Sequence, residues 1–216
     1  MLDLNLPNII SRVIILLTAF SFHEFAHAWV ADHFGDDTPR LHGRLTLNPL
    51  AHLDPIGSLM LILAGFGWAK PVPVNPYALR RRSESAMMWV SLAGPLSNFL
   101  LAILAAIPFR AGLLSSRIAY ISIGGNFPSL DQFLLEWIYI NLVLMLFNLI
   151  PLAPLDGEKI ADYFFPPSWA DFLERIRPYG PMILLLLFVG GNLLGLNIFG
   201  LILGPPMNYI MGLLLG

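Results

Sequence analysis

The chain has 216 residues, of which 56% are hydrophobic and only 12% are charged, with a formal net charge of −2 and no cysteine. A soluble domain carries about 25% charged residues, so this composition indicates an integral membrane protein. It excludes a disulfide framework and a thiolate metal site, and no basic stripe of the kind that binds nucleic acid is present. We expect one compact domain over residues 1–216.

Four apolar stretches are long enough to cross a bilayer as helices, which takes about 20 residues at about 1.5 Å per residue. The predicted spans are residues 9–31, 86–108, 132–150 and 181–203. The predicted fold is therefore an all-α polytopic membrane protein. The short apolar tail after residue 203 is not assigned to any element.

An apolar piece, "PIGSLMLILAGFG" at 55–67, follows the first span and is too short to cross the bilayer. Such a piece is typical of a re-entrant segment that is buried in protein. The next stretch, "KPVPVN" at 70–75, alternates prolines with Val72 and Val74. Because proline has no N–H to donate, a strand of this kind is confined to a sheet edge. We expect a re-entrant segment or β-hairpin over residues 55–75.

The distribution of Lys and Arg predicts the orientation of the chain. Residues 32–85 hold six of them and residues 152–180 hold three, whereas residues 110–131 hold two. Basic loops remain in the cytoplasm, so the C-terminal end of the first span is expected on that side. We expect a multi-pass protein of the cell membrane, of the prokaryotic plasma-membrane type, whose active site opens toward the cytoplasm.

The first predicted span contains "HEFAH", residues 23–27. His23 and His27 share one face of a helix, where two imidazoles can hold one zinc ion. Glu24 is placed to take a proton from a zinc-bound water. The alternative is a pair of helix histidines that hydrogen-bond to neighbouring segments. Ionisable groups at membrane depth favour the functional interpretation, because they are costly to bury there.

Catalytic zinc usually takes three protein ligands, so a third ligand must come from elsewhere. The candidates are His33, His42, His52 and the acidic residues. Asp156 stands out in "NLIPLAPLDG", where two prolines break a helix beside an apolar run. A carboxylate there is costly unless it is paired or bound to metal. An ordinary helix-ending turn is the alternative interpretation.

Five pieces of the sequence, spread over residues 23–157, together resemble the site-2 protease family of intramembrane zinc metalloproteases. They are "HEFAHAW", "GRLTLNPLAHLDPIGS", "GWAKPVPVN", "AGPLSN" and "NLIPLAPLDG". The first motif occurs in many metalloproteases, but its combination with the last is specific to this family. The chain resembles the minimal branch that has no PDZ or CBS domain. Glu158 stands where the family often has a second glycine.

The resemblance implies one Zn²⁺ per chain, with His23, His27 and Asp156 as ligands and Glu24 as the general base. It also implies that Asn148 helps to hold the substrate carbonyl or the oxyanion, although a structural helix-packing amide is the alternative. The "GWAKPVPVN" stretch would belong to a membrane-embedded β-hairpin near the path of the substrate.

Five further residues are candidates for supporting roles. Val72 and Val74 could pair with an unwound substrate by β-augmentation, and Asn98 could face the substrate or only pack between helices. His52 and Asp54 could orient a ligand imidazole or cap the turn that follows them.

The predicted function is hydrolysis of peptide bonds within the transmembrane segments of membrane proteins. The expected partners are a substrate with a transmembrane helix and the lipid bilayer, but no nucleic acid; a homo-oligomer is left open. The alternatives are a membrane zinc transporter and a non-catalytic metal-binding relative. A transporter would not need Glu24 and would usually show more than one polar span, and a non-catalytic relative would not need Glu24 either.

Overall fold

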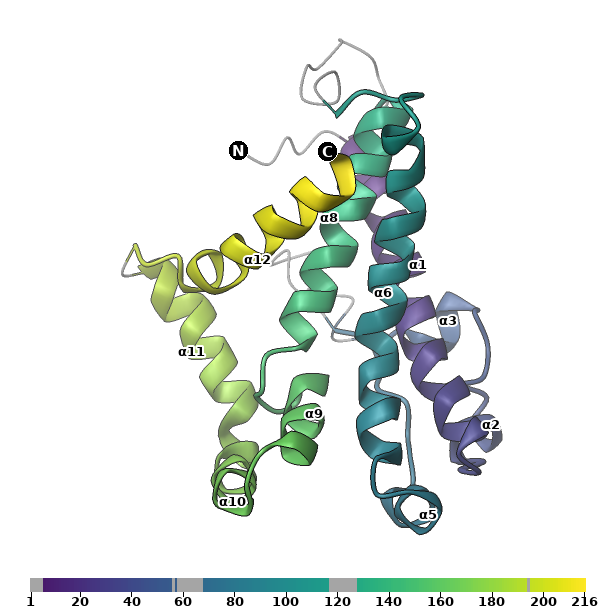
Figure 1. Cartoon of the computed structure of the whole chain (residues 1–216), viewed down its shortest axis with the longest axis vertical. Coiled ribbons are helices and arrows are strands. Elements are labelled where there is room, and N and C mark those ends of the chain that lie inside the picture. The colour runs from purple at the N-terminus through teal and green to yellow at the C-terminus, as the bar shows by residue number, and fades with distance from the viewer. Residues whose placement is uncertain (1–5, 56, 58–67, 117–127, 194) are drawn as a thin grey trace.

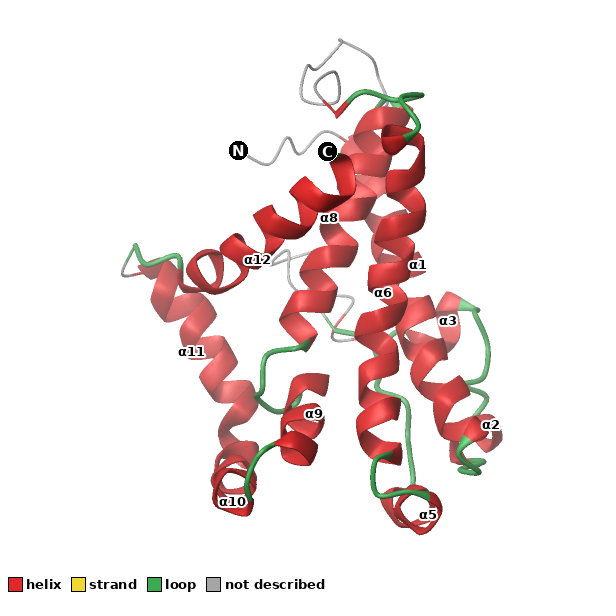
Figure 2. Cartoon of the chain, viewed as in Figure 1, coloured by secondary structure: helices red, strands yellow, loops and turns green. Residues whose placement is uncertain are grey.

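The computed structural model describes residues 6–55, 57, 68–116, 128–193 and 195–216 (Figure 1). Within these ranges the chain forms helices joined by loops, and no β-strand is present (Figure 2). The predicted all-α class is confirmed. The apolar piece predicted to be re-entrant lies almost entirely outside the described residues.

Four helices of the described residues are long and apolar enough to cross a membrane. They are α1 (Leu6–His33), α6 (Ala86–Arg110), α8 (Leu130–Asn148) and α12 (Ile198–Leu215). The first three agree with the predicted spans to within a few residues. Their lengths and composition confirm the predicted polytopic membrane protein.

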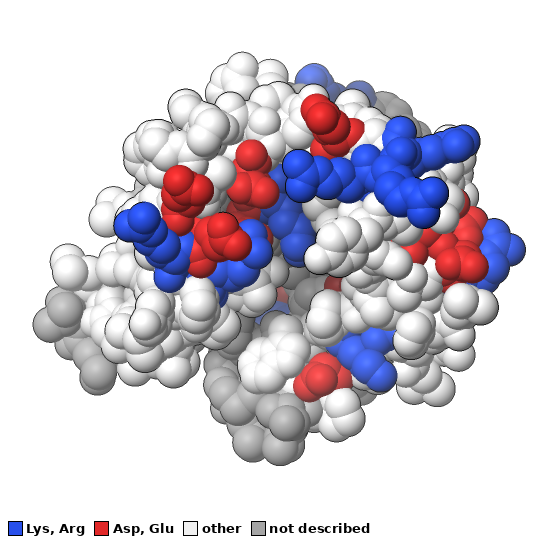
Figure 3. Space-filling view, turned by 90° about the horizontal axis from the view of Figure 1, so that it is seen from below, with Lys and Arg blue, Asp and Glu red and all other residues white. Residues whose placement is uncertain are grey.

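Short helices connect and flank these four. They are α2 (Thr38–Leu41), α3 (Pro49–His52), α5 (Pro76–Arg82), α9 (Asp156–Phe164), α10 (Pro167–Ile176), the 3₁₀ helix η1 (Arg177–Tyr179) and α11 (Gly180–Leu193). The helices α2, α5 and α10 lie at one end of the molecule, the lower end in Figure 1. Figure 3 looks onto this end and shows Lys and Arg side chains spread across it. The two basic loops therefore share one end, as the orientation rule requires.

The predicted fourth span at 181–203 was wrong, because the chain turns within it. Gly195 has a φ of +69°, a conformation that favours glycine. Asn197 then begins a new helix by accepting a hydrogen bond from the Gly200 N–H at 2.9 Å. At 14 residues, α11 is too short to span the bilayer, and the candidate span is α12, which includes the unassigned tail.

The central helix of the fold is α6, which packs against α1, α8, α9 and α12. Alanines at positions 102, 105 and 106 line the α6 surface that faces α8 and α12. Small side chains let the helix backbones approach closely, and close packing is the main attraction between helices in lipid. Near its other end, α6 faces the C-terminal half of α1, where the HEFAH motif lies.

Segment 70–75 runs as an extended chain beside α1. Leu53 and Ala69 form an isolated antiparallel bridge, and the Lys70 N–H donates to the His52 carbonyl at 2.8 Å. The backbone at residues 52–53 therefore lies beside the backbone at residues 69–70. The predicted β-hairpin is reduced to this bridge among the described residues.

Candidate metal centre

Two histidines of α1 and one aspartate of α9 come together beside α6. His23 and His27 are buried, and their ring centroids are 4.6 Å apart. Asp156 Oδ2 lies 3.1 Å from His23 Nε2 and 3.3 Å from His27 Nε2. The candidate donor atoms of the three residues all lie within 4.8 Å of one another. The fold thus joins two motifs that are more than a hundred residues apart.

The break after α8 places Asp156 at the site. The chain turns through the proline-rich residues 149–155, and Asp156 is the first residue of α9. The next residue, Gly157, lies against the end of α8, where a Cβ would come within 2.5 Å of the Leu149 carbonyl carbon. Only glycine allows α9 to fold back this closely, so the "DG" pair both supplies the carboxylate and makes room for the turn.

Hydrogen bonds to Nδ1 fix both histidine tautomers. His23 Nδ1 lies 2.7 Å from the Oδ1 of Asn98, whose amide nitrogen donates to the Ala19 carbonyl and to Asn141 Oδ1. His27 Nδ1 lies 2.7 Å from the Val90 carbonyl. Both acceptors are oxygens, so each Nδ1 carries the hydrogen and each Nε2 presents a lone pair. The two lone pairs converge on the Asp156 carboxylate.

Gly94 of α6 lies directly against the two rings. A Cβ at this position would lie 2.6 Å from His23 Nε2 and still closer to His27 Nε2. The absence of a side chain therefore keeps space open in front of the two donor nitrogens. Gly94 therefore allows α6 to approach α1 closely and also leaves room for an ion at the two histidine nitrogens.

This donor set fits a zinc ion. Two imidazole nitrogens and a carboxylate oxygen are typical zinc ligands, and donors on a tetrahedral ion with bonds of about 2.0–2.1 Å lie about 3.3 Å apart. The separations of 3.1 and 3.3 Å are close to that value. Asp156 Oδ2 is also buried with no hydrogen bond from the described residues, which is costly unless a cation is bound.

The electrostatics of the site favour an ionised carboxylate. Without a bound cation, burial alone would raise the pKa of the Asp156 carboxyl, but protonated His27 and His23 beside it outweigh burial and lower that pKa below its ordinary 3.8. A bound cation would take the place of those two positive charges. An anionic ligand at this position balances part of the charge of a divalent cation.

Glu24 is buried beside His23 and faces segment 70–75. Its Oε2 accepts a hydrogen bond of 3.1 Å from the Val72 N–H. Its Oε1 has no hydrogen-bond partner among the residues that the structure describes, so one oxygen is held and the other is left for a proton. This geometry suits a general base next to a metal-bound water.

Comparison with known proteins agrees with this chemistry. The chain is 45% identical over 177 residues to "Putative zinc metalloprotease YwhC" of Bacillus subtilis, a match that covers 82% of this chain and 79% of the relative. The chain belongs to that family of zinc metalloproteases. "Putative zinc metalloprotease Rip2" of Mycolicibacterium smegmatis is 28% identical over 80% of this chain and 64% of its own length. Rip2 of Mycobacterium tuberculosis is 30% identical, over 83% and 66%.

No family model and no solved structure matches the chain. The relatives establish the protein as a metallopeptidase with Zn²⁺ as its cofactor, and the donor set described above fits that ion.

In this zinc metalloprotease, the structure places three residues for which the sequence left two possible roles each. The sequence left Asn98 either facing a substrate or packing between helices; it is 0% exposed between helices and holds His23. His52 could orient a ligand or cap the turn that follows it, but its Nε2–H donates to the Thr46 carbonyl at 2.7 Å. Asp54 accepts from the Gly57 N–H at 2.8 Å, which agrees with the alternative that it caps the turn after it. The ligands are oriented by Asn98 and the Val90 carbonyl, which sequence reasoning missed.

Other predicted residues of the metalloprotease lie near the site without joining the ligand group. Val74 packs its side chain on the cluster of Ala31, Leu79, Ala86 and Val90. Asn148 donates to the Leu144 carbonyl of its own helix at 2.9 Å. This bond holds the Asn148 amide against its own helix. The oxyanion role of Asn148 stays a prediction, because no substrate contact tests it.

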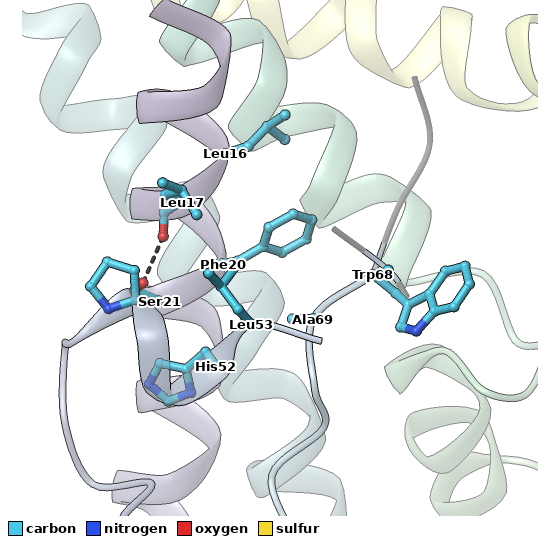
Figure 4. Close-up of a pocket in the computed structure, with 10 residues that line it drawn as sticks. Leu16, Leu17, Phe20, Ser21, His52, Leu53, Trp68 and Ala69 are labelled. Carbon is cyan, nitrogen blue, oxygen red and sulfur yellow. Dashed lines mark hydrogen bonds between the residues drawn. The ribbon is translucent and has the colours of Figure 1, made fainter. Parts of the chain in front are cut away.

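A small cavity adjoins α1 one to two turns before the HEFAH motif (Figure 4). It holds about 20 Å³ and is lined by Leu16, Leu17, Phe20, Ser21, Pro49, His52, Leu53, Gly57, Trp68 and Ala69. The buried His52 Nδ1 has no hydrogen-bond partner in the described part of the chain. The volume suits one water molecule, which would satisfy that nitrogen.

Proposed function

We propose that this metallopeptidase cleaves peptide bonds inside the transmembrane segments of membrane proteins, as the site-2 proteases do. One observation carries the proposal: the group of His23, His27 and Asp156, with Glu24 beside it, lies where α1 and α6, two helices suited to span a membrane, pack together. Intramembrane ionisable groups are expensive and mark function. A peptide bond reaches such a site most directly from within the bilayer.

The proposed roles follow from the geometry. His23 Nε2, His27 Nε2 and Asp156 Oδ2 hold the zinc. When bound, zinc polarises the scissile carbonyl and acidifies a water molecule. The free oxygen of Glu24 takes the proton from that water and passes it to the leaving amine. Asn98 and the Val90 carbonyl keep both imidazoles in the tautomer that presents Nε2.

The substrate must unwind before cleavage, because an intact helix hides its carbonyls in its own hydrogen bonds. The unwound chain is proposed to run beside segment 70–75. The Val72 N–H is already bonded to Glu24, so pairing by β-augmentation would use Val74. Such pairing affects substrate binding and would appear in KM or in the cleavage position.

The decisive experiment uses purified protein in detergent with fluorescent peptides that contain a transmembrane segment. We expect cleavage that a chelator stops and added zinc restores. Glu24→Gln should keep the zinc but lower the rate by roughly 10²–10⁴-fold, because glutamine cannot take the proton. Zinc-loaded protein that cleaves none of the transmembrane peptides, or zinc flux through reconstituted protein without cleavage, would contradict the proposal.

The site is proposed to open toward the cytoplasm of the cell membrane. The HEFAH motif lies in the half of α1 that runs to the basic end of the molecule. Single cysteines can test this side, because the chain has none of its own. We expect Ser83→Cys to resist an impermeant reagent added to intact cells and to react after lysis. Labelling from outside would reverse the orientation.

A further inference from the structure

The first end of segment 70–75 is fixed by a buried arginine. Arg44 is only 4% exposed. One of its terminal nitrogens donates to the carbonyls of Ala51 and Lys70 at 2.7 and 3.1 Å, and the other donates to the Pro71 carbonyl at 3.3 Å. One side chain thus ties the start of the segment to the loop before it.

The other end is fixed by a buried aspartate. Asp36 is 1% exposed, and its Oδ2 accepts from the Asn75 N–H at 2.6 Å. Its Oδ1 accepts from the Thr38 N–H at 3.1 Å, at the start of α2. The segment is therefore attached at both ends by charged groups that are withdrawn from water.

Between these anchors the segment presents one N–H group to the proposed general base. Prolines 71 and 73 fix their own φ angles, and Pro73 keeps Val72 extended. The N–H groups of Lys70, Val72 and Asn75 all have acceptors, namely the His52 carbonyl, Glu24 and Asp36. The Val74 N–H has no acceptor among the described residues. The contact to Glu24 is thus one of three fixed points of a stiff chain.

Charge pairing does not explain the burial of Arg44. Within the described ranges it forms no salt bridge and bonds only to backbone carbonyls. A buried charge costs several kcal/mol unless its hydrogen bonds are satisfied. What these bonds achieve is the placement of segment 70–75 across α1.

We propose that Arg44, Asp36 and the Val72 N–H are a positioning device that fixes the Glu24 carboxylate relative to the metal ligands. This inference rests on the proposed role of Glu24. The side chains hold the segment, the segment holds Glu24 Oε2, and Oε1 is left to take the proton. Misplacement of a catalytic group by about 1 Å can cost about 10²-fold in rate, so the device acts on turnover rather than on zinc or substrate binding.

Two proline substitutions separate positioning from substrate pairing. Val72→Pro removes the N–H that holds Glu24, and Val74→Pro removes one without an acceptor. We expect Val72→Pro to lower kcat by about 10²-fold, with KM and zinc content unchanged. Val74→Pro removes the N–H that is proposed to pair with the substrate, so we expect it to raise KM while kcat falls by no more than a few-fold. Equal loss of kcat in both variants, or near-normal kcat in Val72→Pro, would overturn the inference.

A double-mutant cycle distinguishes positioning from general damage to the fold. In a Glu24→Gln background there is no general base left to position, so Val72→Pro and Arg44→Gln should lower kcat no further. Arg44→Lys keeps the charge but not the forked geometry, and it should fall between wild type and Arg44→Gln. Losses that add fully to that of Glu24→Gln would assign these residues a merely structural role.

Site-resolved hydrogen exchange tests the contact without any assay of cleavage. Glu24→Ala removes the acceptor of the Val72 N–H. Exchange at Val72 should speed up by about 10-fold or more, while Lys70 and Asn75 should stay slow because their acceptors remain. Unchanged exchange at Val72 would refute the contact. A wild-type protein that cleaves no transmembrane peptide would refute the proposed function and leave this result standing.

Discussion

Helix α6 at the metal centre and helix α12 near the C-terminus are similarly apolar, but they differ in how much of their surface is buried in the protein. Half of the most apolar stretch of α6 is buried within the protein, against 6% of that of α12. The buried face of α6 carries Gly94 and Asn98, which serve the histidines, whereas the buried residue of α12 is Met207. Hydropathy reports contact with lipid or protein alike, so it cannot distinguish a helix that builds a site from one that mainly faces the bilayer.

Of three substitutions that test this difference between α6 and α12, Gly94→Ala is expected to have the largest effect on bound zinc and activity. The new methyl group would occupy the space in front of His23 Nε2 and His27 Nε2. We expect bound zinc to fall to a small fraction of one per chain and activity to fall by at least about 10²-fold. Metal analysis of the purified variant checks this. Full zinc content would show that the ion lies away from Gly94.

An intermediate effect is expected from Asn98→Ala. His23 would lose the acceptor that fixes its tautomer, and Asn141 would lose its donor. Loss of such an orienting group typically costs about 10–100-fold in metal affinity or activity. Competition with a zinc chelator measures the affinity. Asn197→Ala, which removes the cap of α12, is the matched control and should leave zinc affinity unchanged.

The smallest effect is expected from Gly204→Ala in α12, the counterpart of Gly94→Ala. A Cβ there meets no atom within 4 Å. We expect unchanged zinc content and turnover, and a gain in stability of about 0.4–1 kcal/mol from the reduced freedom of the unfolded chain. A melting curve beside the metal analysis checks both. Loss of zinc in this variant would show that α12 also supports the metal site.

The grouping of His23, His27 and Asp156 as a candidate metal site was predictable, because these residues are informative by themselves. His23 and His27 have helical spacing, and Asp156 follows a helix break, so both local geometry and composition point to metal. The first three spans were predictable from length and hydropathy. The fourth was not, because residues 181–203 carry no charge, and Gly195 and Asn197 did not by themselves mark a turn in so apolar a run.

The supporting residues were not predictable, because their roles depend on tertiary contacts. Nothing local says which residue of the second span meets His23, so Asn98 was left between a substrate contact and helix packing. Arg44 was counted only as a basic loop residue, and Asp36 received no role. Both are buried because the chain returns at 70–75 and offers them backbone partners. A charged residue in a polar loop is normally exposed to solvent, and only the folded structure shows that Arg44 and Asp36 are buried.

The wide separation of the metal-binding residues along the chain has a consequence for biosynthesis. The proposed ligands His23 and His27 enter the membrane with the first helix, whereas Asp156 follows the third. A nascent chain that has not yet reached residue 156 holds two ligands and cannot assemble the three-ligand centre that catalytic zinc requires. The order of synthesis therefore withholds peptidase activity until α1, α6, α8 and the start of α9 have all been made.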